Sequence, residues 1–408
     1  MDAFIHFQEY SMNPQELHVS IDVGCYQHSI AVGLADGKYL GSFDIDHNKK
    51  GFSDFFLKVE EYKQQSNGQV SIAMEGYNGH ARPLDSMIQS RHYKLLNVNN
   101  LKLARFKEIF PSPAKTDAID ARKGLELFQL QQTLPLAKNV LQEVYEIPKE
   151  NKQLKFLSRR RKRLVFERVR IVNALQSDLR AVSPGLVEIT KDVQNQWFLN
   201  FLSSVKDLRK LAKKTEKTIL KIKQVGKKYC GIIREWQKES IFSEEIEFIS
   251  PLIQQDVSRI KAIEKEIKAL ELSIRELMDT SRIAQRLFSI NGFGEACCSE
   301  LAGEIGTIKR FKKEGALAIY LGMSPLDNSS GLVKSAKNPK QMNKHAKSAM
   351  MSAVDHHRKY SIESSKYYDK KRAEGKAHNQ AIRSLGRHLV RVIYKMLIED
   401  RDYILREK

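Results

Sequence analysis

Four acidic residues have the types and positions expected of a cation site. Asp22 lies near the end of an apolar, β-branched run, and Glu75 directly follows a second apolar run. Asp117 and Asp120 are three residues apart, so on a helix both carboxylates project from one face. A carboxylate inside an apolar strand costs on the order of several kcal/mol unless a cation or hydrogen bonds compensate it. Their oxygens are hard ligands that suit one or two magnesium ions, which polarise a phosphate during its transfer.

The helical pair of acids also has a simpler explanation. Pro111 and Pro113 end the preceding helix, and Thr116 has the right type for the N-cap of a helix that starts at Asp117. Acidic side chains in the first turn of a helix are stabilised by its dipole. Both explanations stay open for Asp117 and Asp120 taken alone, and the acids at the two strand ends favour the metal site.

The residues from 17 to about 128 alternate between strand-like and helix-like runs. Three β-rich runs precede the first helix, which predicts an antiparallel meander followed by helix–strand units. This order is typical of a ribonuclease H-like α/β fold rather than a doubly wound dinucleotide domain, and no phosphate-binding glycine fingerprint is present. The predicted strands are 18–23, 29–34, 39–44, 70–74 and 94–98, and the predicted helices are 51–62, 82–91 and 101–109.

Composition sets broad limits on the class of protein. The 408 residues, of which 41% are hydrophobic, predict a globular chain of more than one domain. The net charge of +20 indicates a polyanionic partner, with nucleic acid favoured over an acidic lipid surface. No apolar run reaches membrane-spanning length and no signal-peptide pattern opens the sequence, which predicts a cytoplasmic location. The cysteines have no metal-ligand spacing and are interpreted as core residues: Cys25, Cys230, Cys297 and Cys298.

Residues 149–180 combine apolar positions at helical spacing with many cations. Five cations are consecutive, and they repel one another unless a polyanion neutralises them. Phosphate contact is therefore predicted here, although a solvated helix face is the alternative. The five residues are Arg159, Arg160, Arg161, Lys162 and Arg163.

The middle of the chain, residues 195–280, reads as helical. Apolar residues at mixed three- and four-residue spacing in 251–278 predict an antiparallel or intermolecular coiled coil, with one helix of an ordinary bundle as the alternative. The segment 205–228 is rich in lysine, and its sequence indicates no specific role.

Two glycine-containing stretches open the C-terminal block. Residues 287–295 lead into a predicted helix, 296–305, and resemble a helix-hairpin-helix in which Gly292 and Gly294 let backbone amides approach phosphate. A second loop, 322–331, follows a predicted helix at 316–321 and contains Ser330. Its Pro, Asn, Ser and Gly residues favour a plain turn, but the cations that follow provide charge for a phosphate that a serine would attack. These cations are Lys334, Lys337, Lys340 and Lys344.

Seven short motifs, in this order and spacing, resemble one family, the bacterial IS-one-ten insertion-sequence transposases. The resemblance covers roughly residues 17–135 and 282–400 and leaves the centre unmatched. The motifs are Ile21-Asp22-Val23-Gly24, Met74-Glu75-Gly76, the stretch 115–122, Ile290-Asn291-Gly292-Phe293-Gly294, Gly303-Glu304-Ile305-Gly306, the stretch 320–325 and Ser329-Ser330-Gly331.

The resemblance implies a RuvC-like nuclease domain with a D-E-D-D tetrad, a coiled coil and a C-terminal transposase domain. It implies that the four acids are catalytic magnesium ligands and that Ser330 attacks a DNA phosphate to form a phosphoserine. It further implies a dimer or tetramer, in which the metal site of one subunit meets the serine of another, and a structured bridge RNA that pairs with donor and target DNA. Two departures are that Asn291 replaces the family's proline and that the stretch near Lys344 lacks its glycine and paired arginines.

The sequence thus predicts a DNA recombinase in three parts: a RuvC-like domain at 1–135, a basic helical region at 136–281 and a transposase domain at 282–408. The alternative is a metal-dependent structure-specific nuclease, similar to Holliday-junction resolvases, in which Ser330 is only a turn residue. A non-enzymatic nucleic-acid scaffold is a third possibility, and the intact tetrad argues against it.

Overall fold

The computed structural model describes residues 16–66, 68–77, 79–109, 116–134, 140–328, 336–337, 339 and 342–404. Contacts divide the chain into two compact units, Met1–Glu146 and Ile147–Lys408. Among the described residues, no helix combines the length and the apolar character needed to span a membrane.

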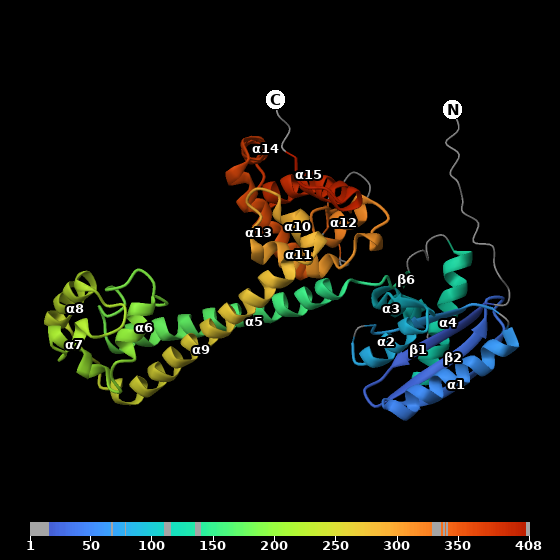
Figure 1. The fold of residues 1–408 in the computed structure, drawn as a ribbon, viewed down its shortest axis with the longest axis horizontal. Helices are drawn as coiled ribbons and strands as arrows, with labels where there is room; N and C mark the ends of the chain where they lie inside the picture. Colours follow the sequence, from blue (N-terminus) through green and yellow to red (C-terminus); the bar gives the residue numbers. More distant parts are fainter. Residues whose placement is uncertain are drawn as a thin grey trace. The chain divides into compact units, whose positions relative to one another are not determined.

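The first unit is a mixed sheet with helices on it (Figure 1). Its strand order is β3-β2-β1-β4-β5-β6, with β1 antiparallel to β2 and parallel to β4. The predicted meander and the helix–strand units that follow it are therefore confirmed. The elements are β1 (Leu17–Val23), β2 (Gln27–Leu34), β3 (Tyr39–Asp46), α1 (Lys49–Ser66), β4 (Val70–Met74), α2 (Arg82–Ser90), β5 (Lys94–Val98), α3 (Asn100–Ile109), α4 (Asp117–Thr133) and β6 (Leu141–Glu143).

Strand β1 is central because both of its faces are covered. Val19 and Ile21 pack into one apolar core, which also contains Phe55 of α1. On the other face His18 stacks on Phe128 of α4, with ring centroids 4.0 Å apart. Successive side chains of a strand point to opposite faces, so the even-numbered residues of β1 face α4.

One strand was not predicted from the sequence. β6 has only three residues and pairs antiparallel with β5 at the edge of the sheet. Its short length carries no recognisable alternation of apolar and polar residues. The strand brings residues up to 146 into the first unit.

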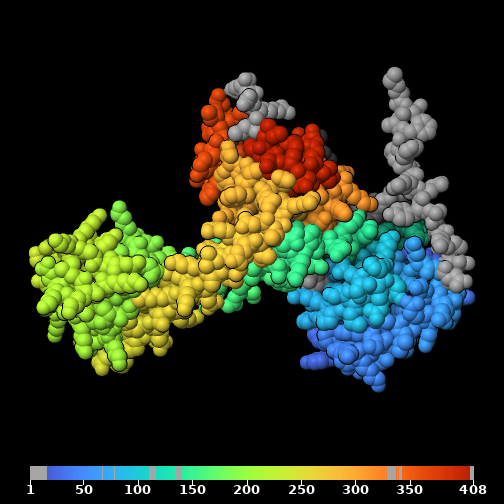
Figure 2. Space-filling model, in the orientation of Figure 1, coloured from blue at the N-terminus to red at the C-terminus, as the bar shows by residue number. Residues whose placement is uncertain are grey.

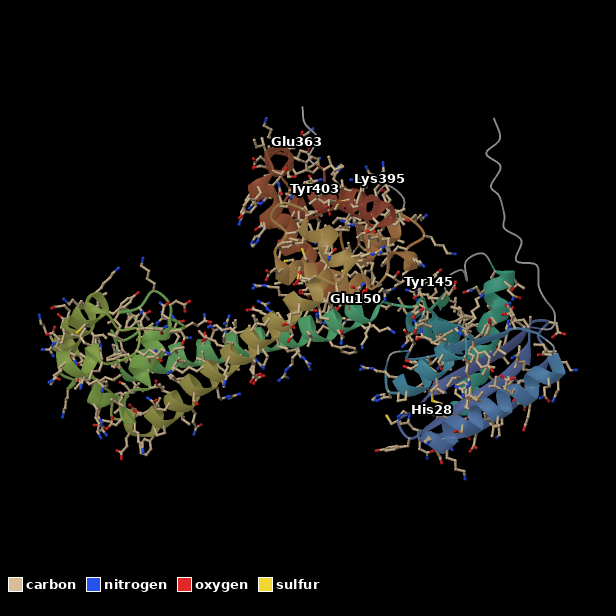
Figure 3. The ribbon with its side chains drawn as sticks, viewed as in Figure 1. His28, Tyr145, Glu150, Glu363, Lys395 and Tyr403 are labelled. Carbon is tan, nitrogen blue, oxygen red and sulfur yellow. The ribbon has the colours of Figure 1, made fainter. Side chains whose placement is uncertain are left out.

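The second unit is helical and contains two long helices, α5 (Lys149–Val182) and α9 (Ile246–Met278), that lie side by side (Figure 1). Their ends carry two apolar cores, one shared with the C-terminal helices and one with a small central cluster. Figure 3 labels Glu363, Lys395 and Tyr403 at the C-terminal helices. The remaining elements are α6 (Gln196–Leu202), η2 (Leu208–Leu211), α7 (Glu216–Leu220), α8 (Lys227–Glu239), α10 (Arg282–Phe288), α11 (Glu295–Ile305), η3 (Ile308–Arg310), α12 (Glu314–Tyr320), β7 (Leu326–Asp327), β8 (Ala336–Lys337), α13 (Lys344–Tyr360), α14 (Ile362–Ala373) and α15 (His378–Glu399).

The two long helices run antiparallel within one chain. Ion pairs join Arg161 to Glu271 near one end and Glu167 to Arg259 farther along, so residue numbers rise on α5 while they fall on α9. The helices have 34 and 33 residues, which corresponds to a length of about 50 Å each. Helix α9 starts at Ile246, five residues before Pro251, which was the predicted start of this helix.

Helix α5 also crosses α11 at very short range. A Cβ atom added at Gly303 would lie 2.5 Å from the backbone nitrogen of Lys155 and 2.6 Å from its Cα atom. These are backbone atoms of a long helix, so they cannot move aside as a flexible side chain does. Gly303 is therefore required by the helix crossing rather than by backbone dihedral angles.

We expect Gly303→Ala to lower the free energy of unfolding by about 1–3 kcal/mol, because it overpacks the α5–α11 crossing. Gly231→Ala in α8 is the matched control, since a Cβ atom there has no neighbour within 4 Å. The control should raise stability by about 0.5–1 kcal/mol through helix propensity. Urea unfolding followed by circular dichroism measures both, and equal effects of the two substitutions would contradict the close crossing.

Candidate functional site

The side chain of Asp22 faces α4 because of the register of β1. Ser20, two residues earlier, meets α4 at Gly124, where an added Cβ atom would lie 2.1 Å from the Ser20 hydroxyl oxygen. Glycine thus lets the helix approach the strand closely. Asp120 lies one turn before Gly124, on the same face of the helix. The contact therefore brings the N-terminal turn of α4 to the end of β1 that bears Asp22.

Glu75 is positioned by the pairing of β1 with β4. The two strands are parallel, with Ile21 opposite Met74. The backbone N–H of Glu75 donates a hydrogen bond of 3.1 Å to the carbonyl oxygen of Ile21. Glu75 therefore follows β4 at the same sheet edge at which Asp22 follows Ile21.

The N-terminus of α4 begins as the sequence predicts. The hydroxyl oxygen of Thr116 accepts a hydrogen bond of 3.3 Å from the backbone N–H of Ile119, which makes it the N-cap. Asp117 is exposed and Asp120 is half-buried. The helix dipole stabilises both carboxylates, so the simpler explanation holds alongside the metal-site prediction.

The other three acids act electrostatically on Asp22. Burial and, after it, the charge of Glu75 raise the pKa of Asp22 to about 6; Asp120 and Asp117 act in the same direction. No hydrogen bond or ion pair of Asp22 is found among the residues that the structure describes. A half-buried carboxylate without a partner, next to three other acids, is a position that attracts a cation.

Lys107 supplies a cation to this cluster. Its Nζ atom lies 3.0 Å from Oδ2 of Asp120 and 3.7 Å from Oε2 of Glu75. Helix α3 thereby contributes to the site, and its charge lowers the pKa of Asp22 against the effect of the acids. Nothing in the sequence around Lys107 pointed to this role, because its partners are distant along the chain.

The donor set fits a divalent cation by its chemistry. All four predicted ligands offer hard carboxylate oxygens, and Asp22 lacks a partner of its own. Across the described part of the chain, however, no three His, Cys, Asp or Glu side chains are grouped closely enough to hold a metal as they stand. In this arrangement the ammonium of Lys107 lies within ion-pair distance of both Glu75 and Asp120 and neutralises part of their charge.

The five consecutive cations of α5 are mostly paired inside the protein. The guanidinium of Arg159 makes two hydrogen bonds to the carboxylate of Glu304, at 2.5 and 2.9 Å. Three further pairs are Arg160 with Glu266, Arg161 with Glu271 and Lys162 with Glu300, and the exposed Arg163 forms no ion pair in the described residues. The premise that these cations need a polyanion is therefore wrong, while their contact with nucleic acid stays a prediction.

Glu304 is the centre of a buried polar network in the second unit. Its carboxylate also accepts a hydrogen bond of 2.7 Å from the side-chain amide of Asn343, which bonds to the hydroxyl of Tyr320 as well. Burial by itself raises the pKa of Glu304, but Arg159, Lys155 and Asn343 together outweigh it and hold the pKa below its usual range. The network thus joins α5, α11, α12 and the N-cap of α13, on both sides of the segment that contains Ser330. The sequence showed Glu304 only as part of a motif.

The other predicted residues are distributed differently. Ser330, Lys334 and Lys340 lie outside the described residues, while Lys337 on β8 and Lys344 at the start of α13 are exposed.

The two glycines before α11 have different surroundings. Gly292 has a φ of +85°, and an added Cβ atom would lie 2.8 Å from the Cα atom of His357 in α13. Its close backbone approach is therefore to a helix of the protein. Gly294 caps α11 and faces open space.

Comparison with known proteins gives matches over most of the chain. A DEDD-type family model described as a transposase matches residues 19–184, and a second, described as a transposase of the IS116/IS110/IS902 family, matches residues 284–369. The chain is 22% identical over 399 residues to an uncharacterized 44.8 kDa protein of insertion element IS116 from Streptomyces clavuligerus, covering 96% of this chain and 97% of that protein.

Two other relatives also come from insertion elements. An IS110 protein of Streptomyces coelicolor is 24% identical over 318 residues, which covers 76% of this chain and 77% of the relative. An IS900 protein of Mycobacterium paratuberculosis is 30% identical over 146 residues, or 35% of this chain and 37% of the relative. The DEDD domain implies a divalent metal cation. The chain therefore belongs to the IS116/IS110/IS902 family of transposases, enzymes of DNA transposition.

Proposed function

We propose that the chain cleaves and exchanges DNA strands with a magnesium-binding acidic tetrad and a serine nucleophile. The observation that carries the proposal is the position of the four acids. Asp22 lies near the end of β1, Glu75 directly follows β4, which pairs in parallel with β1, and Asp120 is one turn before Gly124, where α4 contacts β1. Membership of the transposase family supplies the substrate, DNA.

The first unit is proposed to be a ribonuclease H-like, RuvC-like nuclease domain. An antiparallel three-strand meander whose first strand pairs in parallel with β4 supports this assignment. In a mixed sheet of this kind, acids at the ends of β1 and β4 share one edge with the start of α4. The carboxylates of Asp22, Glu75, Asp117 and Asp120 are proposed to hold the metal there.

A bound divalent cation would polarise the scissile phosphate and stabilise the charge that develops on its oxygens. The remaining work falls to the chain itself. Burial keeps Asp22 in a medium where its charge is poorly screened, so its attraction for a cation is strong. Lys107 would have to give up its contacts with Asp120 and Glu75 for these carboxylates to hold a metal.

Ser330 is proposed as the nucleophile, on the strength of its position in the family motif Ser329-Ser330-Gly331. Its hydroxyl oxygen forms a bond to the phosphorus and loses its proton, while one P–O bond to deoxyribose breaks and releases a sugar hydroxyl. The network of Glu304, Asn343 and Tyr320 fixes both ends of the segment that carries this serine.

A structured guide RNA and a homo-oligomer complete the proposal. The resemblance to the family and the net charge of +20 support the RNA. The proposed dimer or tetramer would let the acids of one subunit meet Ser330 of another. RNA that copurifies and contains loops complementary to the element ends and to the insertion site would support guidance, and random or absent RNA would contradict it.

We expect Asp22→Asn to abolish metal-dependent strand cleavage and also to raise the melting temperature of the metal-free protein. The pKa of Asp22 is raised in the fold, so its ionised form destabilises the protein above about pH 6, and this penalty vanishes below the unfolded pKa of 3.8. The substitution should therefore stabilise by on the order of 1–2 kcal/mol near neutral pH and by much less near pH 4.

The measurement is thermal unfolding in a chelator at about pH 7.5 and about pH 4. Asp54→Asn on α1 is the control, because that acid is outside the cluster. Wild-type cleavage by Asp22→Asn would show that the tetrad is only structural.

We expect Lys107→Gln to increase the affinity for Mg²⁺ or Mn²⁺ by about fivefold. An ion pair of this exposure contributes about 1 kcal/mol, and a divalent cation no longer has to displace it. Arg105→Gln on the same helix is the matched control, since Arg105 is exposed and has no ion pair among the described residues. Titration calorimetry measures the metal affinity of both variants. An unchanged affinity in Lys107→Gln would mean that the ammonium does not compete with the metal for the carboxylates.

We expect a covalent protein–DNA adduct, resistant to denaturant, that is lost in Ser330→Ala and retained in Ser329→Ala. Only the hydroxyl that forms the phosphoserine is needed for the bond, so its neighbour is the matched control. Denaturing gel electrophoresis of end-labelled element DNA detects the adduct. Metal-dependent cleavage with no adduct in any variant would favour the nuclease without a serine intermediate.

A further inference from the structure

The lysine-rich segment, residues 205–228, lies between the two family matches, which end at residue 184 and resume at residue 284. It contains ten cations and two acids, so eight of the chain's twenty net positive charges are concentrated in 24 residues. This density is far above that of the remaining chain. It is not explained by the acid tetrad or by the serine.

The segment is an ordered surface and not a flexible tail. Leu208, Leu211, Ile219 and Val225 are buried in the central apolar core. These residues hold η2, α7 and the start of α8 in place, and most of the cations between them are exposed. The space-filling view shows the cluster of α6, α7 and α8 as a separate lobe on the two long helices (Figure 2). Nitrogen-ended side chains project from this lobe (Figure 3).

The cations of this segment lack internal partners, in contrast to those of α5. One ion pair is found within the segment, between Arg209 and Asp207 at 3.0 Å. Each of the other cations in 205–228, all of which the structure describes, forms no ion pair: Lys206, Lys210, Lys213, Lys214, Lys217, Lys221, Lys223, Lys227 and Lys228. Their mutual repulsion opposes folding, so they are not present to stabilise the lobe.

The N-terminus of helix α8 is also electrostatically unfavourable. Lys227 and Lys228 occupy its first turn, where no acid is present, and its N-cap Gly226 offers no side-chain hydrogen bond. Cations at a helix N-terminus are disfavoured by the helix dipole. An external polyanion would relieve both this interaction and the repulsion among the lysines.

The composition of the segment points to duplex phosphate and not to bases. It has no aromatic residue, whereas proteins that bind single strands stack bases on aromatic side chains. Its one arginine, which is the residue suited to bidentate reading of guanine, is paired with Asp207. Lysines act as point charges that attract phosphates whatever the base sequence.

We propose that residues 205–228 bind the phosphate backbone of duplex DNA without sequence preference. The proposal goes beyond strand cleavage, because it assigns a DNA contact to a part of the chain that neither family model covers. DNA is the polyanion on which a transposase acts. The lobe would hold duplex away from the α10–α15 end of the same unit, at a distance set by α5 and α9.

The test compares two full-length variants of equal net charge. The lysine variant combines Lys213→Gln, Lys217→Gln, Lys221→Gln and Lys228→Gln. The control variant combines Lys265→Gln, Lys268→Gln, Lys312→Gln and Lys313→Gln, at exposed lysines that also lack ion pairs in the described part of the chain. Circular dichroism establishes that both variants fold.

Fluorescence anisotropy measures binding to a random-sequence duplex of about 40 base pairs between about 50 and 200 mM salt. In the lysine variant the slope of log K against log salt concentration should become shallower by about 3 to 4. Between the lowest and highest salt concentration, the variant should therefore lose about 100-fold less affinity than the wild type. The control variant should change the slope by less than about 1.

Equal slopes in the two variants would overturn the proposal, because only bulk charge would then matter. A slope that falls for hairpin RNA but not for duplex DNA would also overturn it and would assign the surface to RNA. The same measurement with the Asp22→Asn chain separates this inference from the proposed function, since duplex binding requires neither the acid tetrad nor Ser330.

Discussion

Repulsion among carboxylates is the constraint on which the first unit depends. Asp22, Glu75, Asp117 and Asp120 lie at one edge of the sheet, and the pKa of Asp22 is raised by its burial and then by the charges of the other three acids. The fold tolerates this through three contributions: the dipole of α4, the ammonium of Lys107 and a higher pKa for Asp22. Repulsion that destabilises Asp22 in the absence of a cation also favours the binding of one, so this instability and the proposed chemistry have the same origin.

The second unit distributes its cations in two ways. Along α5, carboxylates from α9 and α11 neutralise Arg159, Arg160, Arg161 and Lys162, so these residues fasten helices together. In the lysine-rich segment, nearly all cations remain without partners. A high density of cations in the sequence therefore does not identify a binding surface by itself. What distinguishes the two clusters is whether acids from elsewhere in the chain reach them.

The sequence predicted the elements whose signals are local. Apolar, β-branched runs located β1 and β4, and a threonine before two acids located the start of α4, with its cap confirmed at Thr116. The short β6 has too few residues to show a pattern. The start of α9 was missed because Pro251 lies inside its N-terminal part, where proline was taken as a boundary.

The parts of the site that were not predicted depend on contacts between distant residues. Lys107 meets Asp120 only after α3 and α4 have packed, and Arg159 meets Glu304 across 145 positions of sequence. The four acids were found because each has a recognisable local position, near the end of an apolar run or in the first turn of a predicted helix, and a known family has the same motifs in the same order. The neutralising partners carry no comparable pattern, so only the folded chain reveals them.

Helix α5 belongs to both apolar cores of the second unit. Leu154 is part of the core under the C-terminal helices, while Leu164 to Val182 belong to the core of the central cluster, and α9 is divided in the same way. If α5 and α9 separated from one core, apolar residues of the other core would also become exposed. The unit therefore has the connectivity of one cooperative folding block, in which a ligand that stabilises the lobe of α6–α8 also raises the free energy needed to open the C-terminal helices.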